Sequence, residues 1–132
     1  MTRHQMREAA FILTFEKIFS NETTQQLIET AKECNDFEIN QEAICLFENV
    51  DQKKDELDEI IKKYLKKWTI DRISKVALAV LRIAVYEMYY VEDINDDIVI
   101  SEAVKIVQTY TLKDDVTFVN GLLASISRER TK

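Results

Sequence analysis

The sequence predicts an all-α protein of about seven helices, and three observations support this prediction. First, its 132 residues include no proline and a single glycine, Gly121, whereas sheet proteins need many tight turns built on these residues. Second, apolar residues recur at helical spacing along nearly the whole chain. Third, the stretch 76–91, VALAVLRIAVYEMYYV, is apolar on almost every side, which is typical of a helix buried all round. We therefore expect a central helix surrounded by others.

The first three helices are predicted over 3–19, 23–33 and 39–50, with turns that contain Asn and Asp between them. Asp51 is expected to cap a fourth helix that runs to about 67 and has Trp68 at the end of its apolar face. The inward stripe of the first helix is Met6, Ala9, Ala10, Leu13, Phe15, Ile18 and Phe19, and that of the third is Ile39, Ala43, Phe47 and Val50.

The central helix is predicted to start near 72–74 and to end near 91. Its two charges, Arg82 and Glu87, need partners or access to water, because an unpaired buried charge is costly. Arg82 is interpreted as structural, held either by the ring of Tyr86 on the same face or by a carboxylate of a neighbouring helix.

Two further helices are predicted, over 98–110 and from the capping residues Asp114 and Asp115 to about 128. Their inward stripes are Ile100, Ala103, Val104, Val107 and Tyr110 in the sixth helix and Val116, Val119, Leu123 and Ile126 in the last.

The length favours one domain spanning 1–132. The net charge is −6, which argues against an extended basic surface for nucleic acid, so any such site has to be local. Cys34 and Cys45 form no C-x-x-C pair and His4 is the only histidine, so we expect neither a disulfide framework nor a metal site. The central stretch is too short and too interrupted to span a bilayer. No signal peptide is expected, and a cytoplasmic location follows.

A short basic stripe lies on the first helix. Arg3, Arg7 and Lys17 fall on one side of it at 100° per residue, with Thr14 among them and His4 just outside. Such a stripe at a chain terminus can hold phosphates. An ordinary solvated helix face would show the same pattern.

The last helix carries an aromatic residue outside its core stripe, Phe118, together with the polar Thr117 and Asn120. An aromatic ring beside an amide is a plausible platform for an unstacked base, although packing against a neighbouring helix explains it as well. Gly121 costs roughly 1 kcal/mol against alanine inside a helix. Close helix packing is the favoured reason to keep it, and access of a ligand to the backbone is the other.

Tyr86, Glu87, Tyr89 and Tyr90 cluster at the end of the central helix. Tyrosine is enriched at protein–protein interfaces, but tyrosines at the solvated edge of a hydrophobic core would show the same pattern. No phosphate-binding loop, nucleophile elbow or zinc-protease motif is present, and the only histidine is terminal. The sequence therefore predicts a protein that is not an enzyme and needs no cofactor.

Several segments together are similar to one known family. VLRIAVYEM at 80–88, ISEAV at 100–104 and TFVNGLL at 117–123 resemble the NusB family of transcription antitermination factors, and the opening REAA at 7–10 fits it as well. The resemblance implies two small helical bundles packed across each other. It also implies binding to the boxA element of nascent ribosomal RNA, as a heterodimer with NusE, a small-subunit ribosomal protein.

The resemblance carries over to individual residues. Arg3, His4 and Arg7 would belong to the basic N-terminal RNA-binding motif, and Phe118 and Asn120 to the RNA-facing part of the last helix. Asp114 lies in the polar turn just before that part. Tyr86 and Glu87 would lie on the side that binds NusE. The N-terminal motif, TRHQMRE, has few arginines for this family, which implies weak RNA binding without NusE.

We therefore expect an antitermination factor that binds single-stranded boxA RNA together with NusE, and meets other Nus factors and RNA polymerase indirectly, with no contact to DNA or membrane. Two alternatives remain from other classes. One is a protein-interaction module with little or no RNA binding of its own. The other is an RNA-binding domain related to those fused to rRNA cytosine methyltransferases.

Overall fold

Seven α-helices make up most of the part of the chain that the computed structural model describes, residues 2–34, 40–66, 69–111 and 113–130. The contacts divide the chain into two compact units, residues 1–53 and 54–132. The predicted all-α class is confirmed, and each unit is a small helical bundle. That the chain acts as one domain stays a prediction.

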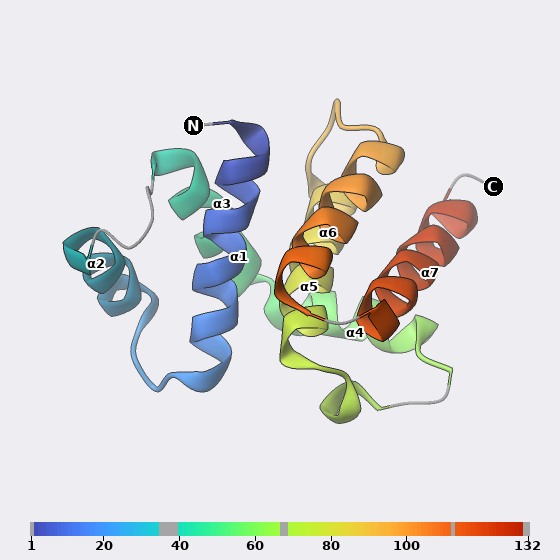
Figure 1. Ribbon diagram of the computed structural model, residues 1–132, viewed down its shortest axis with the longest axis horizontal. Helices are drawn as coiled ribbons and strands as arrows, with labels where there is room; N and C mark the ends of the chain where they lie inside the picture. Colours follow the sequence, from blue (N-terminus) through green and yellow to red (C-terminus); the bar gives the residue numbers. More distant parts are fainter. Residues whose placement is uncertain (1, 35–39, 67–68, 112, 131–132) are drawn as a thin grey trace. The chain divides into compact units, whose positions relative to one another are not determined.

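The first unit contains α1 (Arg3–Phe19), α2 (Thr24–Cys34) and α3 (Gln41–Gln52), in blue to green in Figure 1. Helix α1 packs against both α3 and α2. Its core joins side chains from all three helices, namely Leu13, Leu27, Ile28, Ala31, Ile44 and Phe47.

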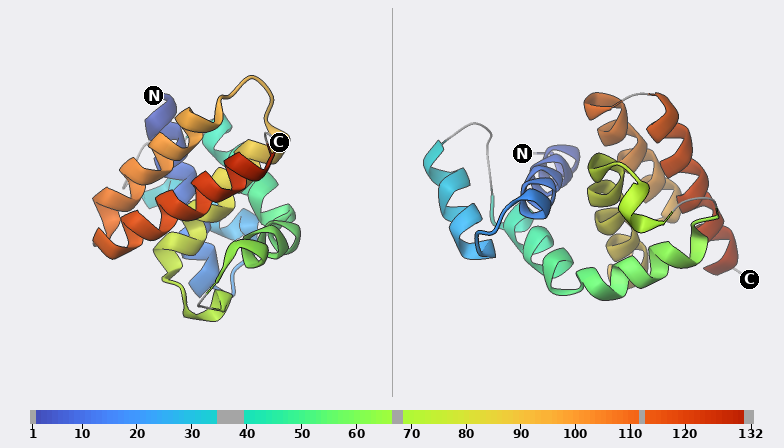
Figure 2. Two further views of the ribbon diagram at one scale, coloured as in Figure 1. Left: turned by 90° about the vertical axis from the view of Figure 1, so that its right-hand side faces the viewer. Right: turned by 90° about the horizontal axis from the view of Figure 1, so that it is seen from below.

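The second unit contains α4 (Lys54–Tyr64), a short 3-10 turn η1 (Ile70–Arg72), α5 (Lys75–Tyr90), α6 (Asp96–Tyr110) and α7 (Lys113–Arg130). Helix α5 packs against α4, α6 and α7. Helices α6 and α7 run side by side, in orange and red in Figure 2. Ten residues of α5 are buried, and the prediction of a central helix surrounded by others is confirmed within this unit.

Polar side chains at the helix starts explain where these helices begin. Asn40, Ser74 and Asn95 each accept a hydrogen bond from a backbone N–H in the first turn, at 2.9, 3.0 and 2.9 Å, which satisfies donors that a helix end leaves unpaired. Asp93, in the turn between α5 and α6, has φ of 68°. Aspartate tolerates this left-handed conformation better than most residues, so it can take a place that glycine would otherwise fill.

Four local predictions were wrong. Asp51 lies inside α3, where it accepts a hydrogen bond of 3.0 Å from the Thr24 hydroxyl, and so it does not cap α4. Helix α4 ends at Tyr64 rather than near 67. Phe19 and Tyr110 are 65% and 41% exposed. Each is the last residue of its helix, and apolar periodicity does not tell where the neighbouring helix stops covering it. Ile39 and Trp68 lie outside the described residues.

Candidate nucleic-acid interface

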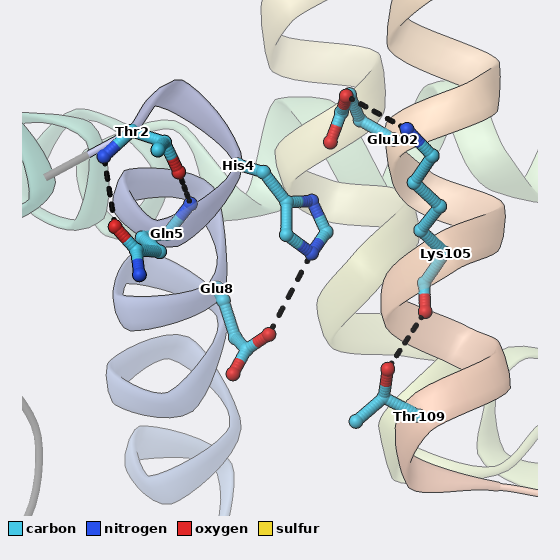
Figure 3. A network of polar contacts seen from close by, with 7 residues as sticks. All are labelled: Thr2, His4, Gln5, Glu8, Glu102, Lys105 and Thr109. Carbon is cyan, nitrogen blue, oxygen red and sulfur yellow. Dashed lines mark hydrogen bonds and ion pairs between the residues drawn. The ribbon is translucent and has the colours of Figure 1, made fainter.

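The start of α1 carries the first group of predicted RNA-binding residues. Thr2 caps the helix by accepting from the Gln5 backbone N–H at 3.0 Å, while the Gln5 side chain accepts from the Thr2 N–H at 2.9 Å (Figure 3). This capping box fixes the first turn. Arg3 is exposed, and His4 lies 3.7 Å from Glu8, within ion-pair distance when the imidazole is protonated.

The rest of the predicted stripe on α1 is less accessible than a solvated face would be. Arg7 is 4% exposed and has polar or electrostatic partners. Thr14 is 5% exposed, and its hydroxyl has no hydrogen-bond partner among the described residues. The interpretation of this stripe as an open face is therefore wrong for Arg7 and Thr14, because the helix turns that carry them are covered. Arg3 is the exposed cation of this stripe.

Within the second unit, Figure 3 shows two local contacts on α6. Lys105 pairs with Glu102 at 3.6 Å, and the Thr109 hydroxyl donates to the Lys105 carbonyl oxygen at 3.0 Å. Because its charge is already paired, Lys105 is a poorer phosphate ligand than a lysine without an acidic neighbour.

The second group of predicted RNA-binding residues lies on α7. Phe118 is half-buried and Asn120 is exposed. Phe118 lines two hollows of the second unit. The larger, about 310 Å³ in volume, is here called the Phe118 groove; it runs between α7 and the end of α4, and its lining includes Tyr64, Leu65, Lys66, Thr117, Gly121 and Ser125. Phe118 thus offers part of its ring to a surface hollow instead of packing fully into the core.

The smaller hollow, about 230 Å³, lies at the starts of α5 and α7 and has a different charge. Arg72 lines it together with Asp114 and Asp115. The Asp115 carboxylate accepts hydrogen bonds from the Ser74 and Thr111 hydroxyls, both at 2.8 Å. These bonds connect the start of α5 and the end of α6 to the start of α7.

The surroundings of Gly121 contradict the interpretation that close helix packing requires a glycine at this position. It is exposed, and a Cβ built on its backbone would meet no atom within 4 Å. Its carbonyl oxygen accepts a hydrogen bond of 3.0 Å from Ser125. Access of a ligand to the backbone, the other reason considered, remains a prediction.

Replacing Gly121 by alanine is expected to raise the free energy of unfolding by about 0.5–1 kcal/mol, because alanine loses less backbone entropy in a helix and meets no clash here. Urea denaturation followed by circular dichroism measures this. The matched control on the same helix is Ala124→Gly, which should lower stability by a similar amount because it introduces the entropy cost that Gly121→Ala removes. A loss of stability in Gly121→Ala would contradict the open environment of the site.

Arg82 is structural, as predicted, and its partner is a carboxylate rather than an aromatic ring. Its Nε and Nη2 atoms donate to Oδ1 and Oδ2 of Asp58 on α4, each at 2.8 Å. This two-pronged geometry is the strongest form of an arginine–carboxylate pair. It connects α4 to α5 and so positions one wall of the Phe118 groove.

The predicted partner-binding residues differ in their exposure. Tyr86 is half-buried and stacks on Tyr90 with ring centroids 5.3 Å apart, whereas Glu87 is 3% exposed. Tyr89 and Tyr90, which the sequence placed in the same cluster, are both 38% exposed. Tyr90 donates a hydrogen bond to Glu56, which raises the pKa of Tyr90. The accessible part of the tyrosine cluster is therefore Tyr89 and Tyr90.

Sequence reasoning missed Tyr64 and Lys66 as neighbours of Phe118. Burial, followed by a hydrogen bond to Glu129, raises the pKa of Tyr64 to about 12. A tyrosine is neutral at physiological pH even at its ordinary pKa of about 10, so the Tyr64 ring adds no charge to this wall of the groove. No sequence motif marks either residue, because only the packing of α4 against α7 brings them to the groove.

The two groups of predicted RNA-binding residues belong to different units: Arg3, His4 and Arg7 to the first, Phe118 and Asn120 to the second. That they share one surface stays a prediction. Among the described residues no cluster of His, Cys, Asp and Glu could hold a metal ion. No helix in the same residues is long and apolar enough to cross a membrane.

These features define a class: small all-helical proteins made of two bundles, with a surface groove that an aromatic residue of the last helix lines. The NusB family model matches residues 4–128, and the chain belongs to the NusB family. The transcription antitermination protein NusB of Oceanobacillus iheyensis is 36% identical to it over 126 residues, covering 96% of this chain and 98% of that protein.

Two solved structures are similar over nearly the whole chain. NusB of T. maritima is 30% identical, with a TM-score of 0.84, over 98% of this chain and 92% of that one. NusB in a complex with NusE and double-stranded RNA is 26% identical, with a TM-score of 0.83, over 96% of both chains.

Proposed function

We propose that the chain is a transcription antitermination factor that binds RNA together with NusE. Relatives across nearly its full length are antitermination proteins, and one similar structure holds NusB, NusE and RNA. The observation that carries the proposal is the half-exposed Phe118 ring, which borders a surface groove on the same helix as the exposed Asn120. The chain acts as an adaptor, without catalysis.

The mechanism combines three kinds of contact. Arg3 and, when it is protonated, His4 attract phosphates. Phe118 offers a face on which a base stacks, and Asn120 offers amide hydrogen bonds to a base edge or to the backbone. Arg7, which is buried here, contributes direct contacts only if its helix turn becomes accessible, and its role as an RNA ligand stays a prediction.

The RNA is proposed to be a single-stranded boxA element of a nascent ribosomal transcript, and the setting is the cytoplasm, where the transcription machinery works. Stacking on Phe118 favours a single strand, because bases in a duplex are not available to an aromatic ring. Through NusE, a small-subunit ribosomal protein, the complex reaches other Nus factors and RNA polymerase. Contact with NusE is proposed for the end of α5, with Tyr86 and Glu87 supporting the exposed Tyr89 and Tyr90.

Tight binding of boxA-like RNA is expected only in the presence of NusE. With a net charge of −6, the protein alone releases few counterions from RNA, and NusE adds contacts that this chain lacks. Filter binding or fluorescence anisotropy with labelled single-stranded boxA RNA, with and without NusE, measures the difference. Scrambled single strands and a duplex of the same sequence are the controls. Equal, salt-insensitive binding of all of these RNAs would refute the proposal.

A second candidate function is a protein-interaction module with little RNA binding of its own. The burial of Arg7 favours it, because it removes one of the two terminal guanidiniums from the surface. In that case NusE would bind normally, while boxA RNA would add nothing to the stability of the complex and would show no preference over scrambled RNA.

A further inference from the structure

The Phe118 groove has one charged residue among its described lining residues, Lys66. Lys66 is exposed and forms no ion pair with the part of the chain that the structure describes. The other described lining residues are apolar or carry neutral hydroxyls, as on Thr117 and Ser125. The groove is thus an apolar hollow with one available cation at its edge.

The second hollow that Phe118 lines is an internal comparison. There Arg72 faces a lining that includes the carboxylates of Asp114 and Asp115. Two negative charges beside one positive charge disfavour a phosphate at short range. Phe118 therefore lines one hollow whose described charge suits a phosphate and one whose charges do not.

Gly121 gives a second, independent observation on the Lys66 side. Its backbone lines the groove, and apart from its chain neighbours and the adjacent backbone of its own helix no atom lies within 4 Å of the place where a Cβ would stand. A glycine in a helix costs stability, and no packing contact in the described structure accounts for it. Absence of a side chain leaves room for a ligand to approach the helix backbone beside Phe118.

We infer that the sugar–phosphate backbone of the bound RNA runs through the Phe118 groove, with Lys66 contacting a phosphate and Gly121 leaving room for the chain beside a base stacked on Phe118. The groove volume of about 310 Å³ falls at the lower end of the range for small-ligand sites. This inference rests on the proposed function and adds to it a path for the RNA backbone and Lys66 as a phosphate ligand. Lys66 is the specific new contact.

The test compares Lys66→Gln with Arg72→Gln, two exposed cations in the two hollows that Phe118 lines, in the complex with NusE and labelled single-stranded boxA RNA. Lys66→Gln should weaken binding on the order of threefold to tenfold and lower the slope of log K against log salt by about 0.7, the value for one phosphate contact on a single strand. Arg72→Gln should leave the slope unchanged. Lys66→Arg should restore it.

Gly121→Ala provides a second measurement. It should weaken RNA binding while the folded state becomes more stable, a combination that a loss of structure cannot produce. Ala124→Gly, which lowers stability on the same helix, should leave RNA affinity unchanged once the protein is confirmed to be folded.

The outcomes separate the inference from the proposed function. If the wild-type complex binds no RNA, the proposed function fails. If it binds RNA and Lys66→Gln changes neither affinity nor slope, or Arg72→Gln changes them equally, the groove is not the path and the inference is overturned. If Lys66→Gln weakens NusE binding without RNA, the groove is a protein contact and the inference is likewise overturned.

Discussion

Phe118→Ala is expected to weaken binding of boxA-like RNA to the complex with NusE by about 1–3 kcal/mol, which corresponds to a loss of roughly fivefold to 150-fold in affinity. The reason is that the substitution removes the face on which a base stacks, while Asn120 and the cations remain. Phe118 is half-buried and lines two surface hollows, so part of it is available to a base. Fluorescence anisotropy at fixed salt measures the change.

Two controls separate stacking from packing. Phe118→Leu keeps much of the apolar volume but has no aromatic face, so it should lose most of the affinity while retaining most of the stability. Phe19→Ala removes an aromatic side chain that is 65% exposed on α1, outside the proposed site, and should leave RNA affinity unchanged. Unchanged affinity in a folded Phe118→Ala protein would remove Phe118 from the site.

Arg82→Ala is expected to lower the free energy of unfolding by about 2–3 kcal/mol, which is large for one side chain. The Arg82 and Asp58 side chains are only 15% and 18% exposed, and Nη2 and Oδ2 lie 2.8 Å apart. Truncating the arginine leaves the Asp58 carboxylate partly buried without its two charged hydrogen bonds. Urea denaturation of the two single variants and the double variant with Asp58→Ala gives the coupling energy.

The pair of Lys62 and Glu59 on the same unit is the matched comparison. It is 3.2 Å long, but its side chains are 49% and 70% exposed. An exposed pair of this kind contributes about 0.5 kcal/mol or less, so Lys62→Ala should change stability little. Equal losses for Lys62→Ala and Arg82→Ala would show that burial and geometry add nothing to the Arg82–Asp58 pair.

Some helix bounds that depend on local chemistry agree with the structure. Helix α1 begins and ends as predicted, and α5 begins at Lys75, next to the predicted start near 72–74. The apolar character of 76–91 indicated a buried helix, and the cost of burying a guanidinium predicted a partner for Arg82, although not that the partner is Asp58. Periodicity and desolvation act over a few residues, so they can be read from the sequence, whereas the cap predicted at Asp51 was wrong.

The sequence did not predict which positions on a helix other parts of the chain cover. Arg7 and Thr14 share an arc with the exposed Arg3, yet both are buried. Gly121 was expected in a tight contact and lies in the open.

The sequence alone therefore determined the helical class, the central helix, the family resemblance and the candidate residues Phe118 and Asn120, because each is written in local periodicity or in a short motif. Tertiary structure alone decided which of those side chains remain accessible, and that the end of α4 brings Lys66 beside Phe118 and Gly121. The physical reason is that residues distant in the chain determine the exposure of a side chain and form the walls of a groove. Local sequence patterns do not show how these distant residues pack.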